Sequence, residues 1–179
     1  MAEGYSTAPL TGLAPLANSD TRLLVLGSFP SVRSLELQQY YGHPQNHFWR
    51  ILGTLWGLPL RESDYAVRRA AALAHGVGIW DVYASCEREG SLDSAIRHAV
   101  VNDLAGLRAR CPDLRAIAHN GGESWRQHRH TEGLGVPVYR LPSTSPANAS
   151  WSFERKLAAW REVFLAAGID VPDAGSAAP

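Results

Sequence analysis

Four short apolar segments alternate with longer segments of helical periodicity along this chain. The apolar segments, bounded by turn-forming residues, are Arg22–Gly27, Gly76–Val82, Leu114–His119 and Val136–Leu141. Short continuous apolar runs of this kind are typical of strands that are buried on both faces of a sheet. We therefore predict four buried strands at these positions.

The segments between and after these strands predict helices. In the last of them, Trp151–Ala167, large apolar residues recur at intervals of four, three and four, which predicts one buried stripe made of Phe153, Leu157, Trp160 and Phe164. Further helices are predicted at Phe48–Leu55, Tyr65–Leu73, Asn102–Arg110 and Glu123–Arg129. Strands that alternate with helices predict an α/β fold, in which a mainly parallel sheet is covered by helices on both faces.

No repeat or linker divides the 179 residues, so we predict one domain at residues 21–168. Residues 1–20 are rich in Ala, Pro, Ser and Thr, and we expect them to form a flexible N-terminal arm. Residues 169–179 have the composition of a disordered tail.

Composition places the chain among ordinary globular proteins, with 45% hydrophobic and 19% charged residues. No apolar run reaches the ~20 residues of a membrane span, and the first residues lack the pattern of a secretory signal. We therefore expect a cytoplasmic protein without a membrane partner, in which Cys86 and Cys111 are free thiols. The 17 basic and 17 acidic side chains balance, which argues against a strong general affinity for nucleic acid but leaves room for a small basic face.

Ligands of open parallel sheets bind beyond the carboxyl ends of the strands. This rule selects four segments that are rich in small, polar or aromatic residues: Gly27–Trp49, Trp80–Glu87, Asn120–Ser124 and Pro142–Asn148. Each could also be an ordinary loop. His128 and His130 are the nearest approach to a metal-ligand pair, but no Cys or carboxylate pair accompanies them, and we expect no metal site.

The first of these segments ends in "PQNHFW" and continues as a predicted helix. The amide of Asn46 could orient a water through its carbonyl oxygen, and the ring of Phe48 could stack on a flat heterocycle. The alternative is that Asn46 caps the helix while Phe48 and Trp49 belong to the core.

The segment "LPSTSPANAS" follows the last strand and offers several hydroxyl donors in a loop stiffened by two prolines. Such a loop suits close approach to a phosphodiester backbone. It would equally suit simple capping of the next helix by Ser150.

In order along the chain, "GSFPS…QQYYGHPQNHFW", "IWDVYASCEREGSLDSAI", "HNGGES" and "LPSTSPAN" resemble the uracil-DNA glycosylase superfamily, and most of all its hypoxanthine-DNA (deoxyinosine) glycosylase branch. The resemblance spans about residues 20–165. It implies a three-layer α/β/α sandwich on a four-stranded, mainly parallel sheet. The first motif departs from the relatives, because Phe29 stands where they place a catalytic Asn or Asp.

The resemblance implies roles for several residues. Asn46 is expected to position the attacking water, Phe48 to stack on the flipped base, and Asp81 to read the base edge. Asp81 could instead pair with a backbone amide or an arginine. Gly27, Ser28 and Phe29 are expected to complete the base pocket. Contacts to DNA and to the leaving base are expected from Ser143, Thr144, Ser145, Pro146, Asn148, Ser31 and Arg33.

The expected function is hydrolysis of the N-glycosidic bond of a deaminated base, most of all hypoxanthine, in single- or double-stranded DNA. We expect a monomer without cofactor that associates with the nucleoid when it acts. Tyr40 and Tyr41 could wedge or stack, or could pack the loop on the body. Three alternatives stay open: a uracil or mixed-specificity glycosylase, a nucleoside or nucleotide hydrolase, and a DNA-binding module without catalysis.

Overall fold

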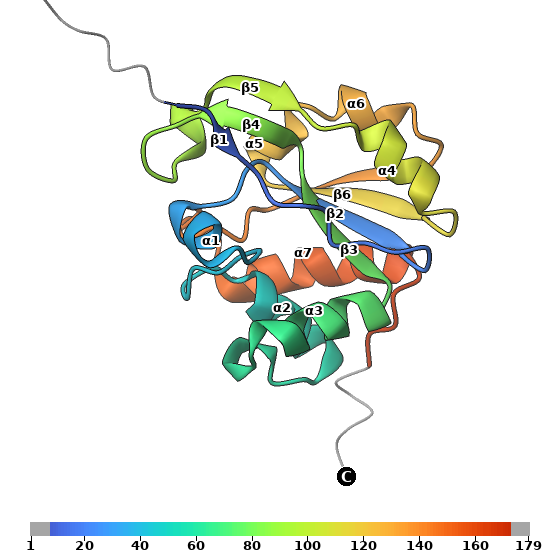
Figure 1. The fold of residues 1–179 in the computed structure, drawn as a ribbon. Coiled ribbons are helices and arrows are strands. Elements are labelled where there is room, and N and C mark those ends of the chain that lie inside the picture. The colour runs from blue at the N-terminus through green and yellow to red at the C-terminus, as the bar shows by residue number, and fades with distance from the viewer. Residues whose placement is uncertain (1–7, 173–179) are drawn as a thin grey trace, which may run out of the picture.

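The computed structural model describes residues 8–172, which fold around a four-stranded parallel sheet (Figure 1). Its strands are β2 (Leu23–Gly27), β3 (Val77–Asp81), β6 (Ala116–Asn120) and β7 (Val138–Leu141). They pair in the order β3-β2-β6-β7, and every pairing is parallel. All four predicted strands are therefore confirmed, each with slightly narrower bounds.

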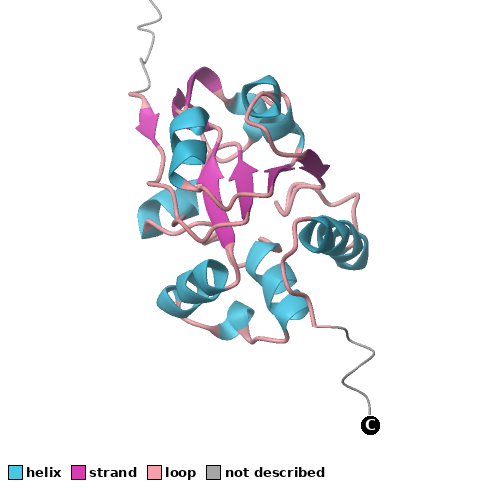
Figure 2. Ribbon diagram, turned by 90° about the vertical axis from the view of Figure 1, so that its right-hand side faces the viewer, coloured by secondary structure: helices cyan, strands magenta, loops and turns pink. Residues whose placement is uncertain are grey.

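Helices cover both faces of this sheet, as Figure 2 shows with the strands between two groups of helices. One face carries α2 (Phe48–Trp56), α3 (Tyr65–Ala74) and α7 (Phe153–Ala166); the other carries α4 (Leu104–Arg110), α5 (Gly122–Trp125) and α6 (Arg129–Glu132). Side chains of β2 alternate between the two resulting cores, because successive residues of a strand point to opposite faces. Leu23 and Val25 enter the core under α2 and α7, whereas Leu24 and Leu26 enter the core under α4.

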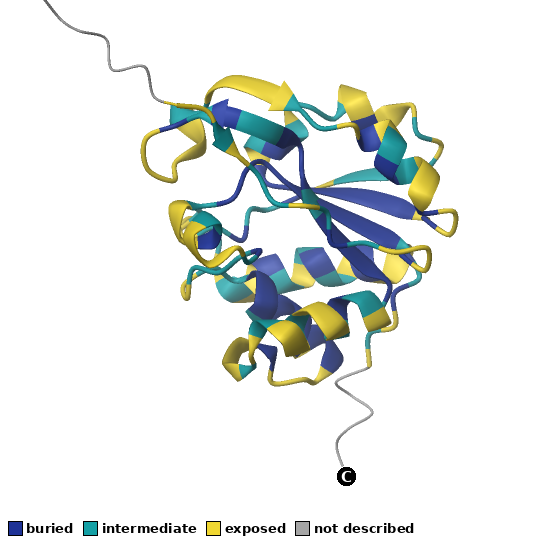
Figure 3. Cartoon of the chain, viewed as in Figure 1, coloured by how far each residue is buried: buried dark blue, intermediate teal, exposed yellow. Residues whose placement is uncertain are grey.

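The stripe predicted for the last helix faces the sheet. Trp160 and Phe164 are completely buried, and Phe153 and Leu157 pack against the same core. Figure 3 shows the sheet as the most buried part of the molecule, with exposed positions on the outer sides of the helices. The helix predicted at Glu123–Arg129 is instead two short helices, α5 and α6, and the short helix α1 (Val32–Leu37) was not predicted.

A second, antiparallel sheet was missed by the sequence-based prediction. It consists of β1 (Leu10–Thr11), β4 (Tyr83–Glu87) and β5 (Arg97–Val101), in the order β1-β4-β5. Four of the five β5 residues are exposed, so this strand has no apolar run that could be recognised. Pairing with β4, rather than burial of side chains, keeps β5 in place.

The predicted domain boundaries are corrected at both ends. Leu10 and Thr11 pair with β4, and the buried Leu16 forms a bridge with Ile79. Ile169 is buried in the core beyond the C-terminal end of α7. The ends of the expected arm and tail, residues 1–7 and 173–179, lie outside the described residues. Within residues 8–172, no helix is long and apolar enough to cross a membrane.

Candidate active site

A cavity of about 900 Å³ opens at the carboxyl ends of the parallel strands. The last residue of every strand of that sheet lines it: Gly27, Asp81, Asn120 and Leu141. Segments that are far apart in the sequence therefore meet at one edge of the sheet, as the strand-end rule predicts. A second hollow of about 850 Å³ lies at the opposite ends of the strands, where no buried carboxyl group lines it.

The end of β2 comes very close to the end of β3. A Cβ atom on Gly27 would stand 2.5 Å from Asp81 Oδ1 and 3.2 Å from Tyr41 Oη. Only glycine leaves space for both polar groups at this point. Ser28, the next residue, donates a 2.7 Å hydrogen bond from Oγ to Asp93 Oδ1, and Phe29 lines the cavity while packing into the core under α4.

Asp81 is the buried carboxyl group of the cavity, with 4% of its surface exposed. Its Oδ2 atom has no hydrogen-bond partner among the described residues, and no ion pair there involves it. Burial, reinforced by the charge of Asp93 and opposed by that of Arg88, raises the pKa of Asp81 to about 7. The expected alternative, a carboxylate paired with a backbone amide or an arginine, is not found within residues 8–172.

Asn46 lines the cavity just before α2 begins. Its Oδ1 atom accepts a 2.9 Å hydrogen bond from the backbone N–H of Phe48. The amide is therefore held by the start of the helix, as the capping alternative proposed. An amide oxygen has a second lone pair, so this contact fixes the group without using all of its accepting capacity.

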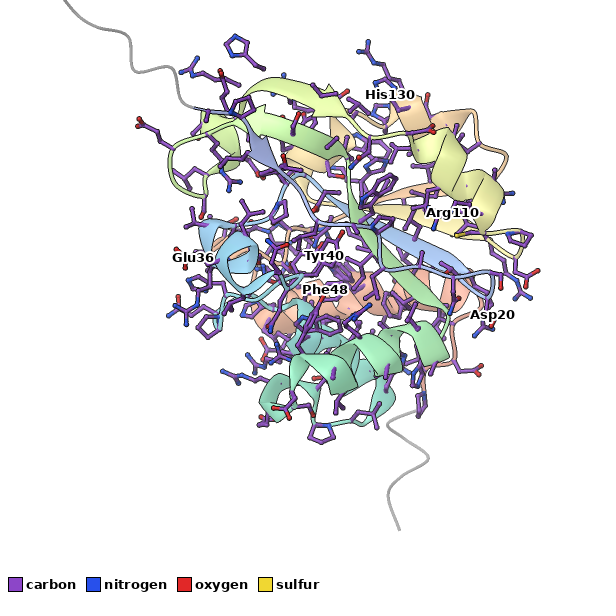
Figure 4. All side chains as sticks on the ribbon, viewed as in Figure 1. Asp20, Glu36, Tyr40, Phe48, Arg110 and His130 are labelled. Atoms are coloured by element: carbon purple, nitrogen blue, oxygen red, sulfur yellow. The ribbon has the colours of Figure 1, made fainter. Side chains whose placement is uncertain are left out.

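Tyr41, not Phe48, presents its ring to the cavity. Phe48 has 0% exposure and lies outside the lining, and the ring of Tyr41 stacks on it with centroids 4.1 Å apart. The expectation that Phe48 touches the base directly is corrected, because the residues 40–42 fold over it. Tyr40 is anchored to the body by hydrogen bonds from Oη to Ala14 O and Leu13 O, and Figure 4 shows Tyr40 and Phe48 in the interior.

Asn120, at the end of β6, was not singled out from the sequence. Its Nδ2 atom donates to Tyr41 Oη at 3.1 Å and to Thr144 Oγ1 at 3.0 Å, while its Oδ1 atom accepts from Thr144 N at 3.0 Å. It thereby joins the loop after β7 to the aromatic wall. Burial and the charge of Asp81 raise the pKa of Tyr41, which keeps its hydroxyl protonated. An amide directly after a buried strand was the available signal.

The loop Pro142–Asn148 forms the side of the cavity next to α7. Internal bonds hold it, because Ser145 N donates to Ser143 Oγ and Asn148 Nδ2 donates to Ser143 O, both at 3.1 Å. The buried Lys156 of α7 reaches Ser145 O with its Nζ atom at 3.4 Å. The predicted loop residues that line the cavity are Ser143, Thr144, Ser145, Pro146 and Asn148.

Of the other predicted contacts, Ser31 lines the cavity and caps α1, since its Oγ atom accepts from Ser34 N at 3.1 Å. Arg33 lies on α1 outside the lining. Both cysteines are free, as expected, and both are buried. Within residues 8–172, no group of three His, Cys, Asp or Glu side chains is placed to hold a metal ion.

Comparison with known proteins gives this cavity its context. The family model of the uracil DNA glycosylase superfamily matches residues 14–164, which is most of the chain. The chain belongs to this superfamily. The resemblance noted in the motifs is therefore confirmed, together with the α/β/α fold that it implied.

Two relatives are similar over 86% of the chain and 96% of their own length. Both are named hypoxanthine DNA glycosylase; the one from Methanosarcina acetivorans is 37% identical and the one from Methanosarcina barkeri 34%. A solution NMR structure of a Methanosarcina acetivorans protein, described provisionally as a uracil DNA glycosylase, superimposes with a TM-score of 0.81. It is 35% identical, and the match covers 90% of this chain and 99% of that one.

Proposed function

We propose that this uracil DNA glycosylase superfamily member hydrolyses the N-glycosidic bond of hypoxanthine in DNA. The observation that carries the proposal is the buried carboxyl group of Asp81, whose Oδ2 atom is unpartnered in a cavity at the carboxyl end of the sheet. The similar proteins named hypoxanthine DNA glycosylase support the choice of base. Hypoxanthine arises when adenine loses its amino group, so its removal is a repair reaction.

Asp81 provides a basis for choosing the deaminated base. Hypoxanthine carries an N1–H donor where adenine has a lone pair, so a carboxylate accepts a hydrogen bond from the first and repels the second. A hydrogen bond from the base favours the ionised form of Asp81, against the burial that raises its pKa. A lost or mismatched hydrogen bond in such a site is worth about 1–3 kcal/mol.

The remaining groups divide the rest of the reaction. The base leaves the DNA stack, which costs a few kcal/mol and least for a mispaired base, and its ring packs on Tyr41, supported from behind by Phe48. Asn46 directs a water to the sugar C1′ as the glycosidic bond breaks and the sugar gains positive charge. Thr144 and its neighbours donate hydrogen bonds to the negatively charged base as it departs.

Base release from defined duplexes tests this function. Labelled duplexes with a single inosine, uracil or xanthine would be incubated with a chelator and then cleaved with alkali at abasic sites. We expect strand breaks at inosine. Breaks at uracil alone would instead assign the uracil reading that the described structural neighbour suggests, and no breaks on any duplex would refute the glycosylase function. Free inosine serves as the control, because its cleavage would indicate a nucleoside hydrolase.

Asp81→Asn separates base choice from catalysis. The amide keeps the size of the side chain but can present a donor to the base, so the preference for inosine over uracil should fall about tenfold or more. An unchanged preference would contradict the role of Asp81 while leaving the glycosylase function intact. We further propose that the protein acts as a monomer, which light scattering of the free and DNA-bound protein would check.

A further inference from the structure

The segment between β4 and β5 carries an exposed leucine at the rim of the cavity. Leu92 has 59% of its surface exposed, the largest value among the large hydrophobic residues within residues 8–172. It is also the only one of those exposed hydrophobics that lines the cavity, beside Ser91, Asp93 and Ser94. An apolar side chain in water at the mouth of a polar cavity needs an explanation beyond folding.

The loop around Leu92 is fastened to the body on both sides. Before it, the Oγ atom of Ser91 accepts from Val32 N at 3.0 Å; after it, Asp93 accepts the 2.7 Å bond from Ser28. The next residues form the 3-10 helix η2 (Asp93–Ala95), whose Ala95 N donates to Leu92 O at 3.0 Å.

A buried arginine completes this fastening. Arg88 donates from Nη2 to Pro30 O at 2.6 Å and from Nε to Gly90 O at 2.7 Å, so the base of the loop is tied to the turn after β2. Leu92 is therefore presented by a rigid loop, at a fixed place beside the strand ends.

Flipping a base leaves an empty place in the DNA stack, and proteins that distort DNA often fill such a place with an apolar side chain. The opposite rim of this cavity, Ser143–Asn148, offers only small or polar side chains and one proline. Trp151 also lines the cavity, but it is partly buried and lies under the guanidinium of Arg155, 4.1 Å from its ring centroid.

We propose that Leu92 inserts into the DNA duplex and occupies the place of the flipped nucleotide. This inference rests on the proposed glycosylase function and adds a second contact surface to it. The fastened loop makes insertion effective, because little conformational freedom is lost when the side chain enters the stack. The carboxylate of Asp93 beside it is engaged by Ser28 Oγ.

The test compares one lesion in two settings. Single-turnover base release would be measured for Leu92→Ala on inosine in a duplex and on inosine in a single strand. An inserted side chain matters only where a stack must be held open, so release from the duplex should fall roughly 10- to 100-fold. Release from the single strand should stay within about twofold of the parent protein, and Leu92→Met should restore most of the duplex activity.

Leu165→Ala is the matched control, since Leu165 is 52% exposed on α7 but does not line the cavity. It should leave both rates unchanged. Fluorescence of 2-aminopurine opposite the inosine reports unstacking independently of cleavage: binding of the parent protein should raise it, and binding of Leu92→Ala should raise it much less. This second readout decides the matter even if single strands are not cleaved.

Three results would overturn the inference. They are an unchanged duplex rate and fluorescence for Leu92→Ala, an equal loss on both kinds of strand, and a duplex-specific loss for Trp151→Ala but not for Leu92→Ala. The equal loss would indicate a structural role of the leucine, and the third result would move the insertion to Trp151. Failure of the parent protein to release any base would refute the proposed function instead, which is a distinct outcome.

Discussion

Replacing Asp81 by asparagine should stabilise this protein, and increasingly so as the pH rises. The pKa of Asp81 is about 7 in the folded protein, against an ordinary value of 3.8. Between these values the folded chain keeps a proton that the unfolded chain has released. Stability therefore falls as the pH rises through this window, and the loss is complete above the folded pKa. The neutral amide of asparagine carries no such dependence.

The magnitude follows from the two pKa values. Their difference of about 3 units corresponds to about 4 kcal/mol at alkaline pH. Because part of this loss is already present in mild acid, the parent protein should lose about 2 kcal/mol relative to Asp81→Asn between about pH 5.5 and pH 8. For a domain of this size, that difference is about 4–8 °C in melting temperature.

Urea and thermal unfolding over this pH range would measure the effect for the parent protein, Asp81→Asn and Asp113→Asn. The last variant removes an exposed carboxylate on a turn, and its curve should run parallel to that of the parent protein. The reasoning would be refuted if the curves of the parent protein and Asp81→Asn were also parallel. A variant that became less stable with rising pH would show instead that the folded protein favours the carboxylate.

Further substitutions test other parts of the site. Asn46→Ala should lower the single-turnover rate about 100-fold or more with little change in DNA affinity, and a rate near that of the parent protein would remove Asn46 from catalysis. Gly27→Ala places a Cβ 2.5 Å from Asp81 Oδ1 and should cost about 1–3 kcal/mol of stability along with most activity; Gly133→Ala, in open space, is the control for both measurements. Burial lowers the pKa of Lys156, so Lys156→Met should change the unfolding free energy by about 1 kcal/mol or less while it loosens the loop after β7 and raises KM for DNA. A large loss of stability would instead mean that the hydrogen bonds of this ammonium group outweigh the cost of burying it.

Much of the fold could be predicted because burial leaves a pattern in the sequence. The four apolar runs mark β2, β3, β6 and β7, and the stripe that includes Trp160 and Phe164 marks α7. The strand β5 could not be found in this way, since most of its side chains are exposed and only backbone pairing with β4 defines it. The same holds for Leu10 and Thr11, whose composition suggested an unstructured arm.

The sequence by itself determined the order of strands and helices, and with it the edge of the sheet at which a site must lie. The motifs also selected Asn46, Asp81 and the loop after β7, all of which meet in the cavity. These features depend on local composition and on chain order.

Only the tertiary structure decided how close these groups stand and which of them face the cavity. It placed Tyr41 over Phe48, tied Asn120 to Thr144, and left Asp81 Oδ2 without a partner within the described chain. The physical reason is that accessibility and pKa depend on neighbours from distant segments. A ring in the sequence does not reveal which other ring covers it, and a carboxylate does not reveal how completely it is buried.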